Sequence, residues 1–339
     1  MTAQMSEAHG VRRFLVTGGA GFVGSHIVAA LRDRGEDVAV LDNLNTGHRA
    51  AVPPGVRLFE ADLADTARLD QILADGPWTA VVHCAGWTQV GESMLMPMRY
   101  LQENAGNGIR LIDACVRHGV NRMVFSSTAA LFNATDDRPI VEDAPIDPQS
   151  PYGDAKWVVE RALHWAFVAH GLRSARLRYF NAAGADPSGR LGEDHRPESH
   201  LIPLVIDAVL GRRPPLDVYG GDYPTADGTC VRDYVHVTDL ADAHLLALSR
   251  LDTEPGVTWN LGSGAGHSVL EVIRSVERIA GRAVPYRIAA RRPGDPAVLV
   301  AASERARAAG WRPRHEALED IVRTAFAWRE AHPGGYGGS

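Results

Sequence analysis

Tyr152 and Lys156, whose side chains could transfer a proton, are four positions apart in the segment 150–156. This spacing places them on one face of an expected helix. A phenol with a pKa near 10 is a poor base at neutral pH, and bringing that pKa to about 7 requires roughly 4 kcal/mol of phenolate stabilisation. One ammonium about 4 Å away, at an effective dielectric near 20, supplies about that much. We therefore predict that Tyr152 is a general base and that Lys156 keeps it ionised.

Lys156 is the only lysine among the 35 basic residues of the chain, and the others are all arginine. A coding preference for arginine explains those others but does not explain why one lysine remains. An arginine could supply charge, but its planar guanidinium does not replace a compact ammonium that also binds ribose hydroxyls. The retention of this lysine therefore favours a specific role for it.

Thr128 lies in the stretch FSSTAA at 125–130, which closes an expected strand. Its hydroxyl is placed to donate to the oxygen from which Tyr152 takes the proton. The alternative is an ordinary hydroxyl at a strand end. Ala129 and Ala130 follow it, so this position offers no carboxylic acid for a second proton transfer.

The glycines before the first expected helix indicate a phosphate site. In TGGAGFVG at 17–24, Gly18, Gly21 and Gly24 stand three apart between a strand and a helix, where the backbone must turn tightly and approach a pyrophosphate. Asp42 ends the next strand, where a carboxylate accepts hydrogen bonds from ribose hydroxyls and repels a 2′-phosphate. These residues predict NAD rather than NADP. Asp62 suits an adenine contact, although by itself it would more often be a solvated loop acid.

The elements that position these residues alternate along the first half of the chain. Apolar runs predict strands, and longer amphipathic stretches predict helices. The strands are expected at 11–17, 38–41, 56–59, 80–84, 122–126 and 172–179, and the helices at 22–34, 98–118 and 150–171. Ser150 is a plausible N-cap, with Pro151 at the first helical position. This order predicts an α/β fold with a doubly wound parallel sheet of the Rossmann type, covered by helices on both faces.

The amino-acid composition changes after Asn181. Residues 182–200 are rich in Gly, Pro, Asp and Ser, which is typical of a loop or a boundary. We expect a dinucleotide-binding domain over 1–180 and a smaller mixed α/β lobe over 181–339, with segments interleaved between the two. Further helices are expected at 201–210, 237–250 and 270–280, and a frayed tail at 332–339.

Composition restricts the class of protein. The chain has 339 residues, 45% of them hydrophobic, and a net charge of −6, which suits a folded protein and argues against a nucleic-acid or anionic-membrane surface. Cys84, Cys115 and Cys230 form no paired motif, so neither a disulfide framework nor a metal site is predicted. No signal-like stretch and no long apolar segment is present, and a cytoplasmic protein is expected.

Taken together, these motifs resemble the extended short-chain dehydrogenase/reductase family, and within it the nucleotide-sugar 4-epimerases, over nearly the whole chain. The segments that carry the resemblance in the first half are VTGGAGFVGSH at 16–26, LDNLNTG at 41–47, HCAGWTQVGES at 83–93, SSTAALF at 126–132 and SPYGDAK at 150–156. The second half adds LRYFNAAGADPSG at 177–189, GEDH at 192–195, DYPTADGTCVRDYVHVTDLADAH at 222–244, WNLGSG at 259–264 and RRPGD at 291–295.

The resemblance implies that Tyr152 takes the proton of a sugar 4-hydroxyl while C4 is oxidised by bound NAD, and that the 4-keto sugar rotates and is reduced on its other face. It implies cofactor contacts from Gly18, Gly21, Phe22, Val23, Gly24, Asp42, Asn43, Asp62, Leu63, Ala85, Gly86, Asn104, Tyr152, Lys156 and Phe180. It implies contacts to a nucleotide-diphosphate sugar from Thr128, Asn181, His200, Leu201, Val218, Tyr219, Arg232, Arg292, Asp295 and Leu299. It also implies a homodimer formed through the helices at 98–118 and 151–170.

Some of these roles have simpler alternatives. Two arginines suit a diphosphate, but in such an arginine-rich chain either Arg232 or Arg292 could be a surface charge. Val218 could pack in the core rather than against the base. Related dehydratases carry an Asp-Glu pair after the threonine and related decarboxylases a Glu, and the alanines here argue against both reactions.

Other positions depart from the epimerase pattern: Thr88 stands where a lysine is usual, Phe132 and Asn133 replace Tyr-Gly, His200 replaces an asparagine, and Leu299 replaces a tyrosine or cysteine. The UDP-glucose/UDP-galactose pair is the expected substrate. The alternatives are an epimerase for another base or a larger sugar, and a non-catalytic nucleotide-sensing protein.

Overall fold

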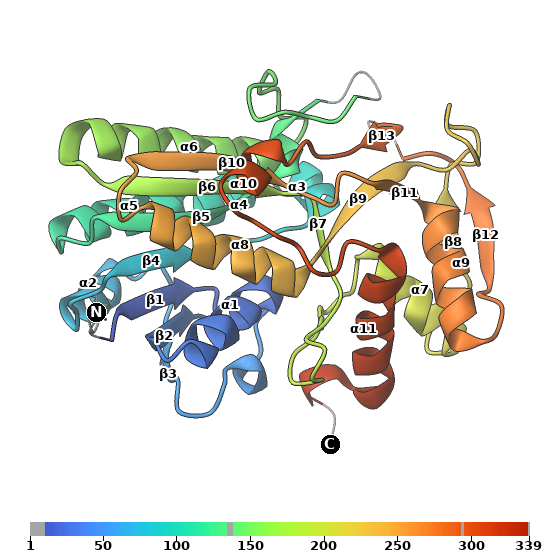
Figure 1. Ribbon diagram of the computed structural model, residues 1–339, viewed down its shortest axis with the longest axis horizontal. Helices are drawn as coiled ribbons and strands as arrows, with labels where there is room; N and C mark the ends of the chain where they lie inside the picture. Colours follow the sequence, from blue (N-terminus) through green and yellow to red (C-terminus); the bar gives the residue numbers. More distant parts are fainter. Residues whose placement is uncertain (1–10, 134–137, 293–294, 338–339) are drawn as a thin grey trace, which may run out of the picture.

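The computed structural model describes residues 11–133, 138–292 and 295–337. Its centre is a sheet of seven parallel strands in the order β10-β6-β5-β4-β1-β2-β3 (Figure 1). These strands are β1 (Arg13–Thr17), β2 (Asp37–Asp42), β3 (Arg57–Glu60), β4 (Ala80–His83), β5 (Arg122–Thr128), β6 (Arg173–Tyr179) and β10 (Gly256–Leu261). The predicted parallel α/β fold is confirmed.

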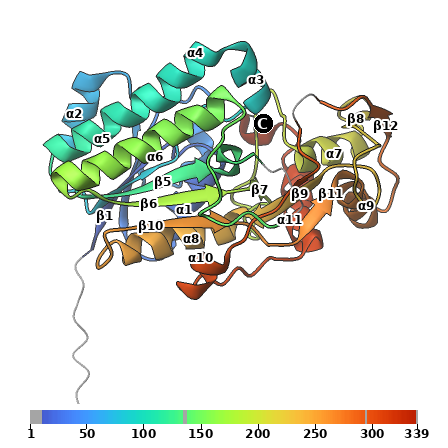
Figure 2. The same cartoon turned by 90° about the horizontal axis from the view of Figure 1, so that it is seen from above.

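Helices cover both faces of this sheet (Figure 2). The helices around it are α1 (Phe22–Asp33), α2 (Thr66–Ala74), α3 (Val90–Leu95), α4 (Pro97–Tyr100), α5 (Asn107–Arg117), α6 (Pro151–His170), α8 (Val237–Arg250) and α10 (Glu304–Ala308). The apolar sides of α1 and α8 share one buried cluster with the sheet, and those of α2, α5 and α6 share another. Strands buried on both faces in this way read in the sequence as nearly continuous apolar runs.

Helix α6 begins as its sequence predicts. The Ser150 hydroxyl accepts a hydrogen bond from the Gly153 amide at 3.2 Å, and Pro151 takes the first helical position. The helix ends at Gly171, whose φ of 72° is the left-handed conformation that favours glycine. This defined start fixes the first turn of α6, where Tyr152 and Lys156 lie.

The long helix predicted over 98–118 is present but not uniform. Between α4 and α5 the chain forms a π-helical stretch over Leu101–Gly106. A π turn holds one extra residue per turn, and such turns are frequent at functional sites. Asn104 lies in this stretch and is buried.

Residues after 181 contribute to both parts of the molecule. Strand β10 pairs with β6 in the main sheet, and α8 packs on α1. The other elements form a lobe at one end of the sheet, with its own buried core (Figure 1). They are β7 (Asn181–Ala183), β8 (Leu216–Tyr219), β9 (Val231–His236), β11 (Gly266–Ser268), β12 (Tyr286–Ala289), β13 (Val298–Leu299), α7 (Leu201–Val209), α9 (Val269–Ala280) and α11 (Leu318–Ala331).

The described part of the C-terminal tail is packed rather than frayed, so the prediction for it was wrong. The Tyr336 hydroxyl accepts a hydrogen bond from the Gly192 amide at 3.0 Å, and the Tyr336 amide donates to Asp194 at 2.9 Å. The glycines around Tyr336 let the chain turn back, and the aromatic ring then finds a site against Trp328. The last two residues lie outside the described part of the chain.

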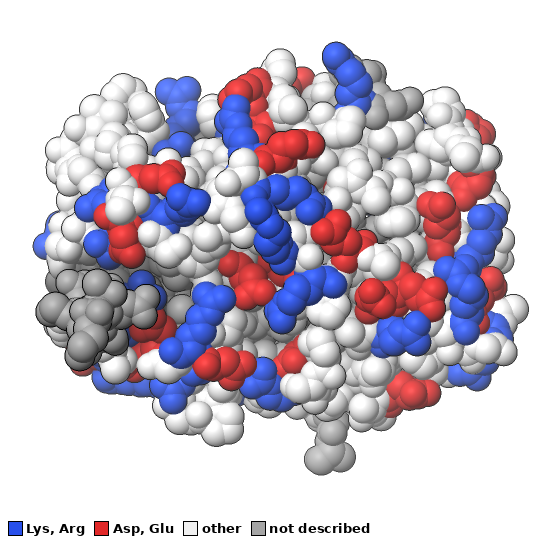
Figure 3. Space-filling model, in the orientation of Figure 1, with Lys and Arg blue, Asp and Glu red and all other residues white. Residues whose placement is uncertain are grey.

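Charged side chains of both signs are interspersed on the face shown in Figure 3. Many of them form ion pairs, such as Arg314 with Asp242 at 2.9 Å. Among the described residues, no helix combines the length and apolar character needed to cross a bilayer.

Candidate active site

The glycine turn after β1 is packed too closely for side chains. A Cβ on Gly18, whose φ is 70°, would lie 2.5 Å from the Ala85 amide nitrogen. A Cβ on Gly24 would lie 2.1 Å from the Gly18 carbonyl oxygen. The turn therefore brings bare backbone to the N-terminus of α1, where amide groups face outward and an anion is favoured. This cradle fits the pyrophosphate of a dinucleotide.

Asp42 ties that turn to the end of β2. Its carboxylate accepts hydrogen bonds from the Ala20 amide at 3.0 Å and from the Leu44 amide at 2.9 Å. Burial raises the pKa of Asp42, and these two backbone bonds oppose the rise. Each carboxylate oxygen keeps a second lone pair, so the group remains suited to ribose hydroxyls.

Asn43 and Asp62 meet beside Asp42, although they are far apart in sequence. The Asn43 side-chain amide donates to the Asp62 carboxylate at 2.8 Å. Leu63 is buried in the core below them. The structure thus brings together Asn43 and Asp62, which are expected at the adenosine end of the cofactor. It turns the side chain of Leu63 into the core.

A second group of predicted cofactor contacts gathers at the end of β4. The Asn104 side chain binds both the amide and the carbonyl of Trp87, at 2.8 Å each. A Cβ on Gly86, whose φ is 150°, would lie 3.0 Å from the Asn104 side-chain oxygen and 3.7 Å from Lys156 Nζ. Gly86 therefore stands between Asn104 and Lys156, with no room for a side chain.

Tyr152, Lys156 and Thr128 converge at the carboxyl end of β5. Lys156 Nζ donates to the Ser126 carbonyl at 2.9 Å and lies 6.0 Å from the centroid of the Tyr152 ring. Burial lowers the pKa of Lys156 to about 8. At pH 7 this lysine is therefore mostly charged, and its ammonium is fixed close to the phenol.

The pKa of Tyr152 differs from the prediction. Burial raises it above the ordinary value for a phenol, and interaction with the Thr128 hydroxyl only opposes the rise. In the chain without bound NAD the direction is therefore opposite to the one expected from Lys156, and the role of Lys156 stays a prediction. Tyr152 is 8% exposed, and burial disfavours the charged form of its phenol.

A buried ion pair, which was not predicted from the sequence, holds together the elements that carry Tyr152, Lys156 and Thr128. Arg178 on β6 donates to both oxygens of Glu160 on α6, at 3.0 and 2.7 Å. The Ser127 hydroxyl also donates to Glu160, at 2.6 Å. Because Ser127 precedes Thr128 and Glu160 lies one turn beyond Lys156, this pair fixes α6 against β5 and β6.

In the lobe, several predicted substrate residues lie around β9. The Asn181 side-chain amide donates to the Asp233 carbonyl at 2.7 Å. Arg232 forms an ion pair with Asp295. Leu299 on β13 is the register partner of Arg232 and is partly buried.

Arg292 and Tyr219 form a second pair, because the guanidinium lies 4.0 Å from the centroid of the ring. Arg232 is thus paired and partly buried, whereas Arg292 is exposed, and its contact with the substrate stays a prediction. The Val218 side chain is 1% exposed and packs in the core of the lobe. This burial favours a packing role for Val218 over contact with the base of the substrate.

The other residues predicted to contact the cofactor or the substrate lie in different environments. Phe180 packs in a buried cluster with Leu131 and Phe132. Leu201 begins α7 and is partly buried, while the ring of His200 is bound to the Glu193 carboxylate. On α1, Val23 packs on the core, and the Phe22 ring meets that of His195 edge to face with centroids 6.4 Å apart.

The sequence and the overall fold are similar to those of known proteins. A family model described as the NAD dependent epimerase/dehydratase family matches residues 14–262. A UDP-glucose 4-epimerase of Azospirillum brasilense is 49% identical over 94% of this chain and 92% of its own, and one of Lacticaseibacillus casei is 46% identical over 95% and 98%. The crystal structure of UDP-glucose 4-epimerase from Brucella ovis in complex with NAD has 43% identity and a TM-score of 0.91, covering 94% of this chain and 98% of its own. The chain belongs to the NAD dependent epimerase/dehydratase family.

Proposed function

We propose that this protein is an NAD-dependent UDP-sugar 4-epimerase that interconverts UDP-glucose and UDP-galactose. The observation that carries the proposal is the meeting of Tyr152, Lys156 and Thr128 beside the glycine cradle, in a chain whose relatives are named UDP-glucose 4-epimerase. Bound NAD supplies the oxidation and re-reduction at C4. Relatives at this identity support both the cofactor and the substrate.

The chain's own residues would divide the work as follows. Tyr152 takes the proton of the 4-hydroxyl and later returns it, while the Thr128 hydroxyl orients the same oxygen. Lys156 supplies a fixed positive charge that favours the phenolate. Because burial alone raises the pKa of Tyr152, we infer that the positive charge of the bound cofactor is needed before this phenol can act as the base.

The experiment that tests the function is incubation of the purified protein with UDP-glucose or UDP-galactose, with the configuration at C4 followed by NMR. Either sugar should give the same mixture of the two. Conversion of neither sugar would contradict the proposal. Loss of water would instead indicate a dehydratase, although Ala129 and Ala130 offer no acid for that reaction.

Replacing Gly24 by alanine should weaken NAD binding about 10- to 100-fold, because overpacking costs about 1–3 kcal/mol. The added Cβ would meet the Gly18 carbonyl, which is backbone and cannot rotate away. The measurement is the NAD content of the purified variant and its affinity by fluorescence titration. Gly91→Ala is the matched control, because a Cβ there meets no atom within 4 Å.

A larger sugar is a second candidate, because Leu299 stands where the epimerase pattern has a tyrosine or cysteine and Phe132 packs nearby. Leucine is smaller than tyrosine, although larger than cysteine, and a wall smaller than tyrosine would admit an N-acetylated sugar. Leu299→Tyr should then lower kcat/KM for UDP-N-acetylglucosamine relative to UDP-glucose by about 10- to 200-fold. An unchanged ratio of the two kcat/KM values would mean that this position does not set the size of the pocket.

We also propose that the protein is a homodimer that pairs α5 and α6 with their copies. Val158, Trp165 and Val168 form an exposed apolar stripe on α6, and Ile109 on α5 is 45% exposed. Trp165→Asp should convert the dimer to a monomer in sedimentation experiments. Ile288→Asp, which changes an equally exposed apolar residue on β12, should leave the dimer intact.

We infer a cytoplasmic location, which the three free thiols support, because such thiols are typical of a reducing compartment.

A further inference from the structure

The end of the chain packs against the loop of the lobe that follows β7. Tyr336 lies in a short turn over Gly335–Gly337, and its amide donates to the Asp194 carboxylate at 2.9 Å. Its hydroxyl accepts from the Gly192 amide at 3.0 Å and donates to the Gly192 carbonyl at 3.2 Å. Burial raises the pKa of Tyr336 to about 12, so the hydroxyl keeps the proton that it donates. The tail is therefore fixed to this loop by its last described turn.

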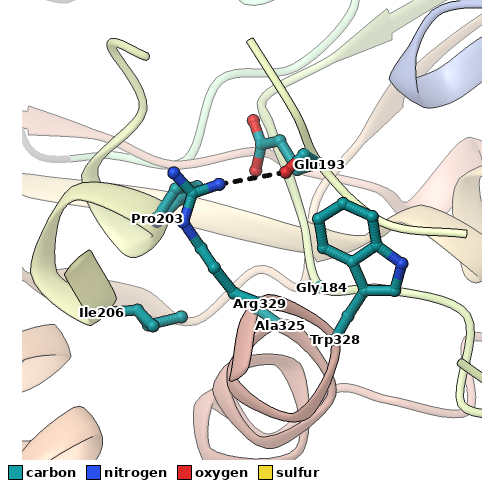
Figure 4. Close-up of a pocket in the computed structure, with 7 residues that line it drawn as sticks. All are labelled: Gly184, Glu193, Pro203, Ile206, Ala325, Trp328 and Arg329. Atoms are coloured by element: carbon teal, nitrogen blue, oxygen red, sulfur yellow. Dashed lines mark hydrogen bonds between the residues drawn. The ribbon is translucent and has the colours of Figure 1, made fainter. Parts of the chain in front are cut away.

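Helix α11 holds the other side of the same loop. A Cβ on Gly192 would clash with the indole of Trp328, so the bare backbone of this glycine lies directly on the ring. Arg329, the next residue of α11, donates to the Glu193 carbonyl at 3.1 Å (Figure 4). The Tyr336 ring packs on Trp328, with centroids 5.2 Å apart. The loop is therefore enclosed between the helix and the tail.

His48 connects this enclosed loop to the predicted cofactor site. Its Nε2 lies 2.9 Å from the Asp194 carbonyl oxygen, which can only accept, so this nitrogen carries the proton. The His48 ring also packs on the Tyr336 ring, with centroids 5.2 Å apart. The His48 backbone amide donates to the Ala20 carbonyl in the glycine turn at 2.9 Å. Direct contacts thus connect the tail, through His48, to the cradle that fits the pyrophosphate.

The segment between Asp42 and His48 needs such support. Leu44 has a φ of 58°, a left-handed conformation that is strained for a residue other than glycine. Gly47 packs closely on the glycine turn, because a Cβ there would lie 3.0 Å from the Ala20 side chain and from the Asp42 carboxylate. Strained backbone persists only where the surrounding contacts fix it. The conformation of this predicted adenosine site therefore depends on the contacts that hold His48 in place.

We propose that Tyr336 and His48 are positioning residues for the cofactor: they hold the segment 42–48 against the glycine turn and so strengthen the binding of NAD. This inference rests on the cofactor site of the proposed function. Neither side chain needs to touch the cofactor, because each acts through the segment that it fixes. A segment that is ordered before binding costs no further ordering when NAD binds, so the cofactor binds more tightly.

The test measures how fast NAD bound to the purified full chain exchanges with an excess of isotope-labelled NAD, in the absence of any sugar. If loss of the aromatic ring leaves the segment ordered in only about one tenth of the molecules, the apparent affinity falls about 10-fold. Such a loss should appear mainly as faster dissociation. We therefore expect exchange about 10-fold faster, or more, in Tyr336→Ala and in His48→Ala. Tyr286→Ala removes an exposed tyrosine of β12 and should exchange NAD as the wild type does.

Exchange as slow in both variants as in the wild type would overturn the proposal. Because the two residues act through one segment, the double variant should exchange NAD no more than about 2-fold faster than the faster single variant. Effects that multiply would show that the two residues act independently, which also overturns it. If Tyr336→Ala fails to fold by circular dichroism, His48→Ala decides, because it leaves the bonds of the tail to Gly192 and Asp194 in place.

This experiment is separate from the test of the reaction. Faster NAD exchange in the two variants, together with no conversion of either UDP-sugar by the wild type, would contradict the proposed reaction and support the role of the tail. Conversion of the sugars by the wild type, together with unchanged exchange in the variants, would do the reverse.

Discussion

Tyr152→Phe should lower kcat by about 10²- to 10⁴-fold, the usual contribution of a general acid or base. The change removes only the hydroxyl oxygen and keeps the ring, which packs edge to face with Tyr100 at 6.5 Å. Folding and NAD content should therefore stay as in the wild type. The remaining rate would come from substrate positioning, which the variant retains.

The pH profile separates this role from a structural one. In the wild type, kcat/KM should rise with pH as the phenol loses its proton, and in Tyr152→Phe this rise should vanish. Tyr100→Phe is the matched control, because it removes another buried hydroxyl, one that donates to Glu92 at 2.7 Å. If Tyr152→Phe keeps wild-type activity, another group must be the base.

Glu160→Ala should lower the free energy of unfolding by about 3–5 kcal/mol, because it leaves the Arg178 guanidinium buried without its partner. The two side chains are 2% and 7% exposed, so water cannot replace the lost interaction. Urea unfolding, followed by circular dichroism, gives the change in stability. Because the pair holds α6 against β5, kcat should fall as well, although Glu160 touches neither substrate nor cofactor in the proposed mechanism.

Two further variants test whether this loss of stability comes from the buried ion pair. Glu160→Leu combined with Arg178→Met should recover most of the stability, since apolar side chains of similar size often replace a buried ion pair at no cost. Glu319→Ala breaks an exposed ion pair with Arg323 on α11 and should change stability by less than about 1 kcal/mol. Equal losses for Glu160→Ala and Glu319→Ala would contradict the reasoning from burial.

Local signals explain which elements the sequence predicted. Strands β1 and β4 each contain an unbroken apolar run, over 14–16 and 80–82, and α6 carries its cap in Ser150 and Pro151, so both kinds of element could be recognised from neighbouring residues. Helix α2 was missed although Leu69, Ile72 and Leu73 follow a helical period and Asp65 caps it through the Arg68 amide. Its apolar residues are interspersed with polar ones, whereas α7, which has the same length and was predicted, is apolar over most of its residues.

Long-range pairing explains what the sequence could not predict. The place of β10 beside β6 depends on a crossover that spans about half of the lobe, and no local pattern encodes it. The Glu160–Arg178 pair joins a helix to a strand, and its two residues lie 18 positions apart in the sequence. The upward shift of the Tyr152 pKa has the same origin, because it depends on burial that only the folded chain creates.

The position of β10 has a consequence for biosynthesis. This strand is encoded after half of the lobe, yet it covers the outer edge of β6 in the main sheet, and α8, which precedes it, covers α1. A nascent chain that has emerged from the ribosome only as far as residue 180 therefore exposes an unpaired strand and an apolar helix face, which are sites of aggregation. The seven-stranded sheet therefore cannot be completed until translation has passed Leu261.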